Sequence, residues 1–96
     1  MTNTSEKKYL IDDETPLSEI PYKTPVYFVM ETEVTKSGEY IALIAEKGVP
    51  GFSRTDWYWG KDWEKACLIA DDMNAGLGVS PKAAARIQMT TMRVLR

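Results

Sequence analysis

The sequence contains no histidine and a single cysteine, Cys67. Without histidine, the chain lacks the most common general base, the usual member of a catalytic triad and the imidazole ligand of many metal sites. One cysteine cannot form a disulfide within the chain, and no second cysteine or histidine is present to complete a zinc site. These absences disfavour an enzyme, and we expect no cofactor and no structural metal. They do not exclude a calcium site that is made of carboxylates alone.

Long hydrophobic segments are also missing from the sequence. The longest uncharged apolar run is IALIA, at 41–45, which is far shorter than the roughly 20 residues that a membrane-spanning helix requires. The polar start, MTNTSEKK, has no apolar stretch of the kind found in signal peptides. These features predict a cytoplasmic protein that does not associate with a membrane.

Charge is distributed unevenly along the 96 residues, although the formal net charge is only −2. Acidic residues outnumber basic ones in residues 1–33, whereas residues 81–96 contain bases and no acid. A chain of this length is too short for two domains. We interpret residues 1–24 as a polar, acidic N-terminal segment and residues 25–96 as a single α+β domain. The apolar side chains of the N-terminal segment that could dock on the core are those of Tyr9, Leu10, Ile11, Leu17 and Ile20.

Three segments have the two-residue alternation and the β-branched and aromatic content that are typical of strands. They are PVYFVMETEV at 25–34, EYIALIAEK at 39–47 and FSRTDWYW at 52–59. The turn signals TKSG and GVPG separate these segments and predict antiparallel pairing between consecutive strands. In the third segment, alternation places Trp57 and Trp59 on one face of the sheet and Tyr58 on the other.

Two helices are expected after the strands. The first lies in KDWEKACLIADDMNAGLG, at 61–78, where Asp62 is the expected N-cap and a glycine ends the helix. The second begins with Ser80 as N-cap and Pro81 at the first helical position. The predicted fold class is therefore α+β, with an antiparallel sheet of two to three strands packed on two C-terminal helices, in the order ββ(β)αα. Both helices are expected to cover the same face of the sheet.

Two features of the first helix could still carry chemistry. Asp71 and Asp72 are adjacent, so they point about 100° apart on a helix and do not converge on one atom. Cys67 lies near the helix start, where a thiol pKa can be lowered, but it sits in an apolar stretch without a histidine to accept its proton. We expect the two aspartates on a solvated helix face and Cys67 in the core.

All three tryptophans lie within TDWYWGKDW, at 55–63. Tryptophan and tyrosine are frequent at binding hot spots. However, a chain with only two phenylalanines must obtain bulky core side chains elsewhere. We expect at least two of the tryptophans in the core, with Tyr58 and one tryptophan left partly exposed.

The stretch 55–87, TDWYWGKDWEKACLIADDMNAGLGVSPKAAARI, resembles short, mostly uncharacterised proteins of phages, plasmids and integrated elements. Those proteins have an aromatic strand ending in WG, a helix ending in N-x-x-LG and a helix opened by serine. The matching residues here are Trp57, Trp59, Gly60, Asn74, Leu77, Gly78 and Ser80. The resemblance implies an origin in a mobile genetic element and brings no catalytic residue. Small acidic proteins of that origin often occupy a surface of a host protein, as anti-CRISPR counter-defence proteins do.

These observations predict a small non-enzymatic binding protein that inhibits or regulates a host protein or a protein–nucleic acid complex, in the manner of an anti-CRISPR protein. Carboxylates can imitate phosphates in such a complex, and aromatic side chains can anchor it. The predicted partner-binding residues are Asp12, Asp13, Glu14, Glu31, Glu33, Tyr58 and Trp59.

The alternative is a nucleic-acid-binding protein that uses a basic stripe on the C-terminal helix. The residues of that stripe are Lys82, Arg86, Arg93 and Arg96. The negative net charge makes nucleic acid the less favoured partner. A homo-oligomer is a separate possibility, because an edge strand can pair with a copy of itself.

Overall fold

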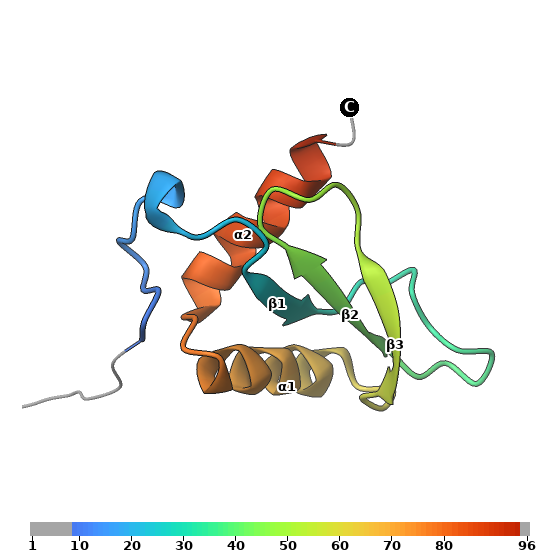
Figure 1. The fold of residues 1–96 in the computed structure, drawn as a ribbon. Coiled ribbons are helices and arrows are strands. Elements are labelled where there is room, and N and C mark those ends of the chain that lie inside the picture. The colour runs from blue at the N-terminus through green and yellow to red at the C-terminus, as the bar shows by residue number, and fades with distance from the viewer. Residues whose placement is uncertain (1–8, 95–96) are drawn as a thin grey trace, which may run out of the picture.

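A three-stranded antiparallel sheet comes first along the chain and two α-helices follow it, which confirms the predicted α+β class. The structure is a computed structural model that describes the backbone of residues 9–94 and the side chains of residues 9–91. Figure 1 shows how the elements are arranged. In chain order they are the 3-10 helix η2 (Leu17–Glu19), β1 (Pro25–Phe28), β2 (Ile41–Glu46), β3 (Ser53–Tyr58), α1 (Trp63–Gly76) and α2 (Pro81–Val94).

The sheet has the order β1-β2-β3, so β2 lies in the centre. β1 is shorter than the strand predicted at 25–34, because the chain turns after Phe28, where the Met30 carbonyl accepts the N–H of Glu33 at 3.1 Å. Val34 then forms an isolated antiparallel bridge with Tyr40, just before β2. β2 and β3 lie within the predicted segments, and both strand pairs are antiparallel as predicted.

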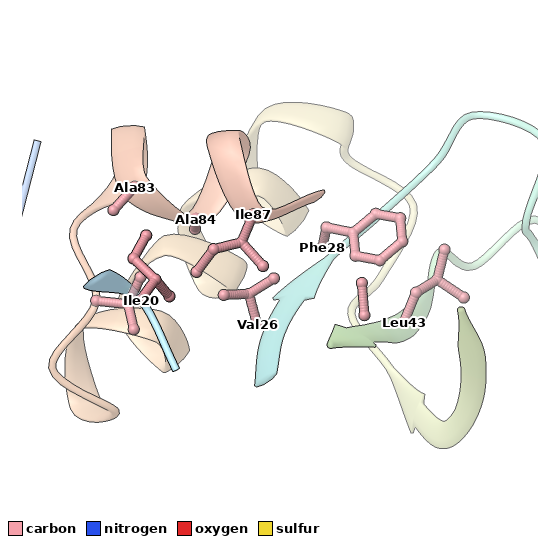
Figure 2. Close-up of a cluster of buried hydrophobic side chains, with 9 residues drawn as sticks. Ile20, Val26, Phe28, Leu43, Ala83, Ala84 and Ile87 are labelled. Carbon is pink, nitrogen blue, oxygen red and sulfur yellow. The ribbon is translucent and has the colours of Figure 1, made fainter. Parts of the chain in front are cut away.

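The core lies between one face of the sheet and α2 (Figure 2). β1 and β2 supply side chains that pair across the two strands, Val26 with Ala45 and Phe28 with Leu43. α2 supplies small and branched side chains, which let the helix approach the sheet closely, from Ala83, Ala84 and Ile87. Burial of these apolar side chains is the main force that holds α2 on the sheet.

Two residues of the N-terminal segment pack on this core. Ile20 is 2 % exposed and belongs to the core, and Ile11 is half-buried against it, so these two residues dock as predicted. Leu10 and Leu17 were expected to dock as well, but both are exposed. The Ile11 N–H donates to the Gly78 carbonyl at 2.8 Å, and the Ile11 carbonyl accepts the Ser80 N–H at 2.9 Å. These bonds form a short parallel bridge that fastens the segment to the link between α1 and α2.

The two helices hold different positions, whereas we expected both on one face of the sheet. α2 contacts β1 and β2, while α1 contacts β1 and α2. The buried stripe of α1 consists of Ala66, Ala70 and Asn74. Small side chains and an amide suit the polar edge of a strand better than a broad apolar face, so α1 packs along β1.

Both helices begin where the sequence predicts. The Asp62 carboxylate accepts the Lys65 N–H at 3.2 Å, and the Ser80 hydroxyl accepts the Ala83 N–H at 3.1 Å. Between the helices, Gly78 has a φ of 84°, which a residue without Cβ adopts readily. Over the described residues, neither helix combines the length and the apolar content that crossing a membrane demands.

Candidate protein interface

The two outer edges of the sheet differ in how their backbone groups are satisfied. The Asn74 side chain of α1 is buried beside β1, where its Oδ1 accepts the Tyr27 N–H at 2.7 Å and its Nδ2 donates to the Tyr27 carbonyl at 2.9 Å. The amide thus takes the place of a neighbouring strand on β1. Among the described residues nothing pairs with the outer side of β3, which is the open edge of the sheet.

β3 contains a bulge that shapes this open edge. Ile41 pairs with Tyr58 and Leu43 pairs with Arg54, so two steps along β2 correspond to four steps along β3. The Thr55 hydroxyl fills the gap, because it donates to the Ala42 carbonyl at 2.8 Å and accepts the Trp57 N–H at 3.0 Å. Bulges of this kind redirect side chains and are frequent near functional sites.

Two large aromatic side chains are exposed on β3. Trp57 is 48 % exposed and Tyr58 is 52 % exposed. The Tyr27 ring lies 5.8 Å from Trp57 and 6.2 Å from Trp59, between ring centroids. Trp57 and Trp59 therefore share the face of Tyr27, as alternation predicts, and this face is opposite to the core. We call Tyr27, Trp57 and Trp59 the aromatic patch.

The expectation that at least two tryptophans lie in the core was wrong. Trp57 is exposed, whereas Trp59 and Trp63 are half-buried, and none of the three belongs to the core cluster. Trp63 instead begins α1 and packs edge-on against Tyr40, with ring centroids 5.2 Å apart. The physical reason is that alanine and branched side chains already fill the narrow space between α2 and the sheet.

The predicted acidic residues divide into two groups that lie on different sides of the molecule. One group, Glu31 and Glu33, belongs to the loop between β1 and β2, where the Glu33 carbonyl accepts the Ile41 N–H. Glu33 is paired, because its Oε1 accepts the Arg54 Nε–H at 2.6 Å, and Glu31 is exposed. Figure 1 shows this loop far from the blue N-terminal segment, which carries the other group.

That other group, Asp12, Asp13 and Glu14, mainly serves the fold. The Asp12 carboxylate accepts the N–H of Glu14 and the hydroxyl of Thr15, both at 3.0 Å, and these hydrogen bonds lower the pKa of Asp12. The Asp13 carboxylate accepts the Ser80 hydroxyl at 2.6 Å. Of the three carboxylates, only that of Glu14 has no hydrogen bond among the described residues. The group therefore offers less free negative charge than the sequence suggests.

The basic stripe of the alternative prediction is also engaged in part. Arg86 is half-buried, and its Nη1 donates to the backbone carbonyl of Asp13 at 2.9 Å. Lys82 is exposed. The side chain of Arg93 and all of Arg96 lie outside the described residues, so the stripe as a whole stays a prediction. The bond from Arg86 gives that residue a structural role on the N-terminal segment.

Of the possible catalytic groups, Cys67 and Asp71 line a small groove of about 160 Å³ between β1, α1 and α2, and Asp72 is exposed. Cys67 is half-buried there, where burial, followed by the negative charges of Asp71 and Glu64, raises the pKa of its thiol. Burial and the charge of Asp72 raise the pKa of Asp71. A raised thiol pKa reduces the thiolate that attacks a substrate. In the described part of the chain, no three cysteine or carboxylate side chains gather as a metal site.

The sequence interpretation missed Asn74 and Thr55, which define the two sheet edges. Asn74 follows Ala66 and Ala70 at intervals of four residues, so its place on the buried side of the helix was readable. The sequence does not indicate that Tyr27 is its partner, because the two residues are 47 positions apart. Thr55 looks like any other alternating strand residue, and nothing in its neighbours indicates that its hydroxyl joins two strands.

A comparison with known proteins finds no match to the chain among protein families, curated proteins or solved structures. The resemblance to phage and mobile-element proteins over 55–87 therefore stays a prediction. Four of the seven residues that carry it have clear structural roles in this protein. Gly60 and Gly78 have positive φ values of 80° and 84°, Ser80 caps α2, and Asn74 closes the edge of β1.

Proposed function

We propose that the protein is a small non-enzymatic binding protein that docks on another protein through the aromatic patch, with Trp57 as the anchor. The observation that carries this proposal is the 48 % exposure of Trp57 on a sheet face that α2 does not cover. Tryptophan and tyrosine dominate the energy of many protein interfaces, because they bury a large area and lose little side-chain entropy. The Tyr27 ring packs beside Trp57 and also beside Trp59.

The biological role that fits this chemistry is inhibition or regulation of a host protein in the cytoplasm. The resemblance to proteins of mobile elements supports that role, and so does the lack of histidine. The groove at Cys67 adds to the argument against an enzyme, since a thiol with a raised pKa is a poor nucleophile at neutral pH. An anti-CRISPR-like protein would combine these properties.

The experiment isolates complexes of the tagged protein from host cells and rebuilds them from purified components. We expect one partner to bind in a fixed ratio, and Trp57→Ala to weaken binding by more than about tenfold. Tyr58→Ala tests the opposite face of the same strand and should have a smaller effect. Leu68→Ala is the matched control, because Leu68 is an exposed apolar residue on α1, away from the patch.

Two results would contradict the proposal in different ways. If a rebuilt complex keeps its affinity in Trp57→Ala but loses it in Tyr58→Ala, then the partner docks on the other face of β3. If no protein forms a complex of fixed ratio while the purified chain is folded, then the binding function itself is wrong.

A further inference from the structure

The open edge of β3 carries a charge pattern that is complementary to itself. Arg54 and Asp56 lie on either side of Thr55, and both are exposed. The opposite edge of the sheet is closed by Asn74, so β3 is where another strand can be added. Charged and bulged edges discourage pairing with arbitrary strands, which leaves room for a partner with matching charges.

The backbone of β3 limits how such a strand can pair. The Trp59 N–H donates to the Tyr40 carbonyl, next to β2. The Trp57 N–H donates to the Thr55 hydroxyl, which in turn donates to the Ala42 carbonyl of β2, so both N–H groups are on the side of β2. In an antiparallel strand the N–H and C=O groups of alternate residues point to opposite sides. The backbone groups of Tyr58 therefore point outwards, and we infer the same orientation for Asp56, two positions earlier within the bulge. The bulge adds an even number of residues, so Arg54 keeps the same orientation.

Only outward-pointing residues can form hydrogen-bonded pairs with an added strand, and this restricts the register. If two copies of β3 pair about a two-fold axis at Thr55, Arg54 of each copy lies opposite Asp56 of the other. A register centred on Arg54, or one centred on Asp56, places like charges opposite each other. Opposite charges across a strand pair are stabilising and like charges are destabilising, so the charges favour the register centred on Thr55.

We propose that β3 pairs with β3 of a second copy in this register, joining two three-stranded sheets into one. The interface is closed and symmetric, as in most homodimers. Arg54 can take part while bonded to Glu33, because that bond uses only its Nε and the guanidinium has further donors. Trp57 lies opposite the small Ser53 of the second copy, so no bulky pair opposes the approach of the two strands.

The symmetry has a consequence for the aromatic patch. A two-fold axis at right angles to the sheet keeps each face of one copy continuous with the same face of the other. The two aromatic patches therefore lie on one common face, and both α2 helices lie on the other. A dimer of this form presents two anchors to a partner, which raises the effective affinity for a partner with two sites.

Charge-swap variants test the register, with mass measured by analytical ultracentrifugation over a range of concentrations. We expect the wild-type chain to dimerise, and Arg54→Asp or Asp56→Arg alone to raise the dissociation constant by more than about tenfold. An equimolar mixture of the two single variants should dimerise again, since each then meets opposite charges. The double variant Arg54→Asp/Asp56→Arg should also dimerise. Circular dichroism and thermal melting verify that each variant is folded.

The proposal is overturned if the wild-type chain stays monomeric up to about 1 mM, a concentration at which weak pairing is visible. It is also overturned if folded single variants dimerise as the wild type does, or if their mixture stays monomeric. If a charge reversal prevents folding, the milder variant Asp56→Asn replaces it. In addition, hydrogen exchange at the Asp56 N–H of the wild-type chain must slow as the protein concentration rises. The dimer is independent of the proposed host partner, because Trp57→Ala leaves the charge pair intact.

Discussion

The side-chain amide of Asn74 forms two hydrogen bonds with the backbone of Tyr27, one to its N–H at 2.7 Å and one to its carbonyl at 2.9 Å. The pair joins α1 to β1 and satisfies polar groups that would otherwise be buried without partners. It also decides which edge of the sheet stays open. A residue with this position stabilises the fold and at the same time determines where another strand can bind.

Replacing Asn74 by alanine should therefore destabilise the protein. The substitution leaves the N–H and the carbonyl of Tyr27 unpaired next to a small cavity, which costs about 2–3 kcal/mol of the free energy of unfolding. Urea denaturation measures this loss. Asp72→Ala is the control, because Asp72 is exposed on the same helix and should change the free energy by less than about 0.5 kcal/mol. Equal effects of the two substitutions would show that the amide contributes nothing specific.

The Thr55 hydroxyl should be essential for the shape of β3. Thr55→Val keeps the volume but removes the group that links the Ala42 carbonyl to the Trp57 N–H, so we expect a loss of about 1–2 kcal/mol. Because Trp57 shifts when the bulge relaxes, its fluorescence should change as well. Thr32→Val, at an exposed loop position, is the control. A stable variant with unchanged fluorescence would contradict this role.

Ser80 should contribute to stability through two bonds, and these can be separated. Its hydroxyl accepts the Ala83 N–H as the cap of α2 and donates to the Asp13 carboxylate. We expect Ser80→Ala to cost about 1–2 kcal/mol. Asp13→Ala removes only the second bond and should cost less than about 1 kcal/mol. Hydrogen exchange at the Ile11 N–H measures release of the N-terminal segment and should accelerate in both variants.

Cys67 should react slowly with alkylating reagents at neutral pH. Burial and the charges of Asp71 and Glu64 raise the pKa of the thiol, so the thiolate forms only at higher pH than in a free thiol. The curve of alkylation rate against pH should therefore lie at higher pH than that of a small thiol. Asp71→Asn removes a negative charge and should move the curve back towards lower pH. Asp72→Asn is the matched control and should leave the curve unchanged. The explanation is contradicted if the wild-type curve lies at the same pH as that of the small thiol, or at lower pH.

Much of the fold follows from interactions between residues close together in the chain. Asp62 and Ser80 each cap a helix by accepting an N–H three positions later, so the two helix starts can be predicted. The alternation of apolar and polar residues identifies β2 and β3, and it places Trp57 and Trp59 on one face. Alternation does not say which face another element covers. For that reason the prediction that most of the tryptophans are buried was wrong.

The candidate site depends mainly on contacts between distant residues. Asn74 reaches Tyr27 across 47 positions, and Ser80 reaches Asp13 across 67. Such pairs depend on how the helices pack on the sheet, and packing follows from the fit of many side chains at once. Contacts between distant residues also engage Asp13, Glu33 and Arg86, which the sequence presents as free charges. α1 closes the edge of the sheet at β1, whereas no described element pairs with the outer side of β3.

The sequence by itself therefore determined the α+β class, the order of the elements, the helix caps and the lack of histidine chemistry, because each depends on composition or on neighbouring residues. Only the tertiary structure decided that α1 closes β1, that β3 stays open and that Trp57 is exposed. Local hydrogen bonds and periodicity act over a few residues, whereas the burial of a side chain depends on every element that packs against it.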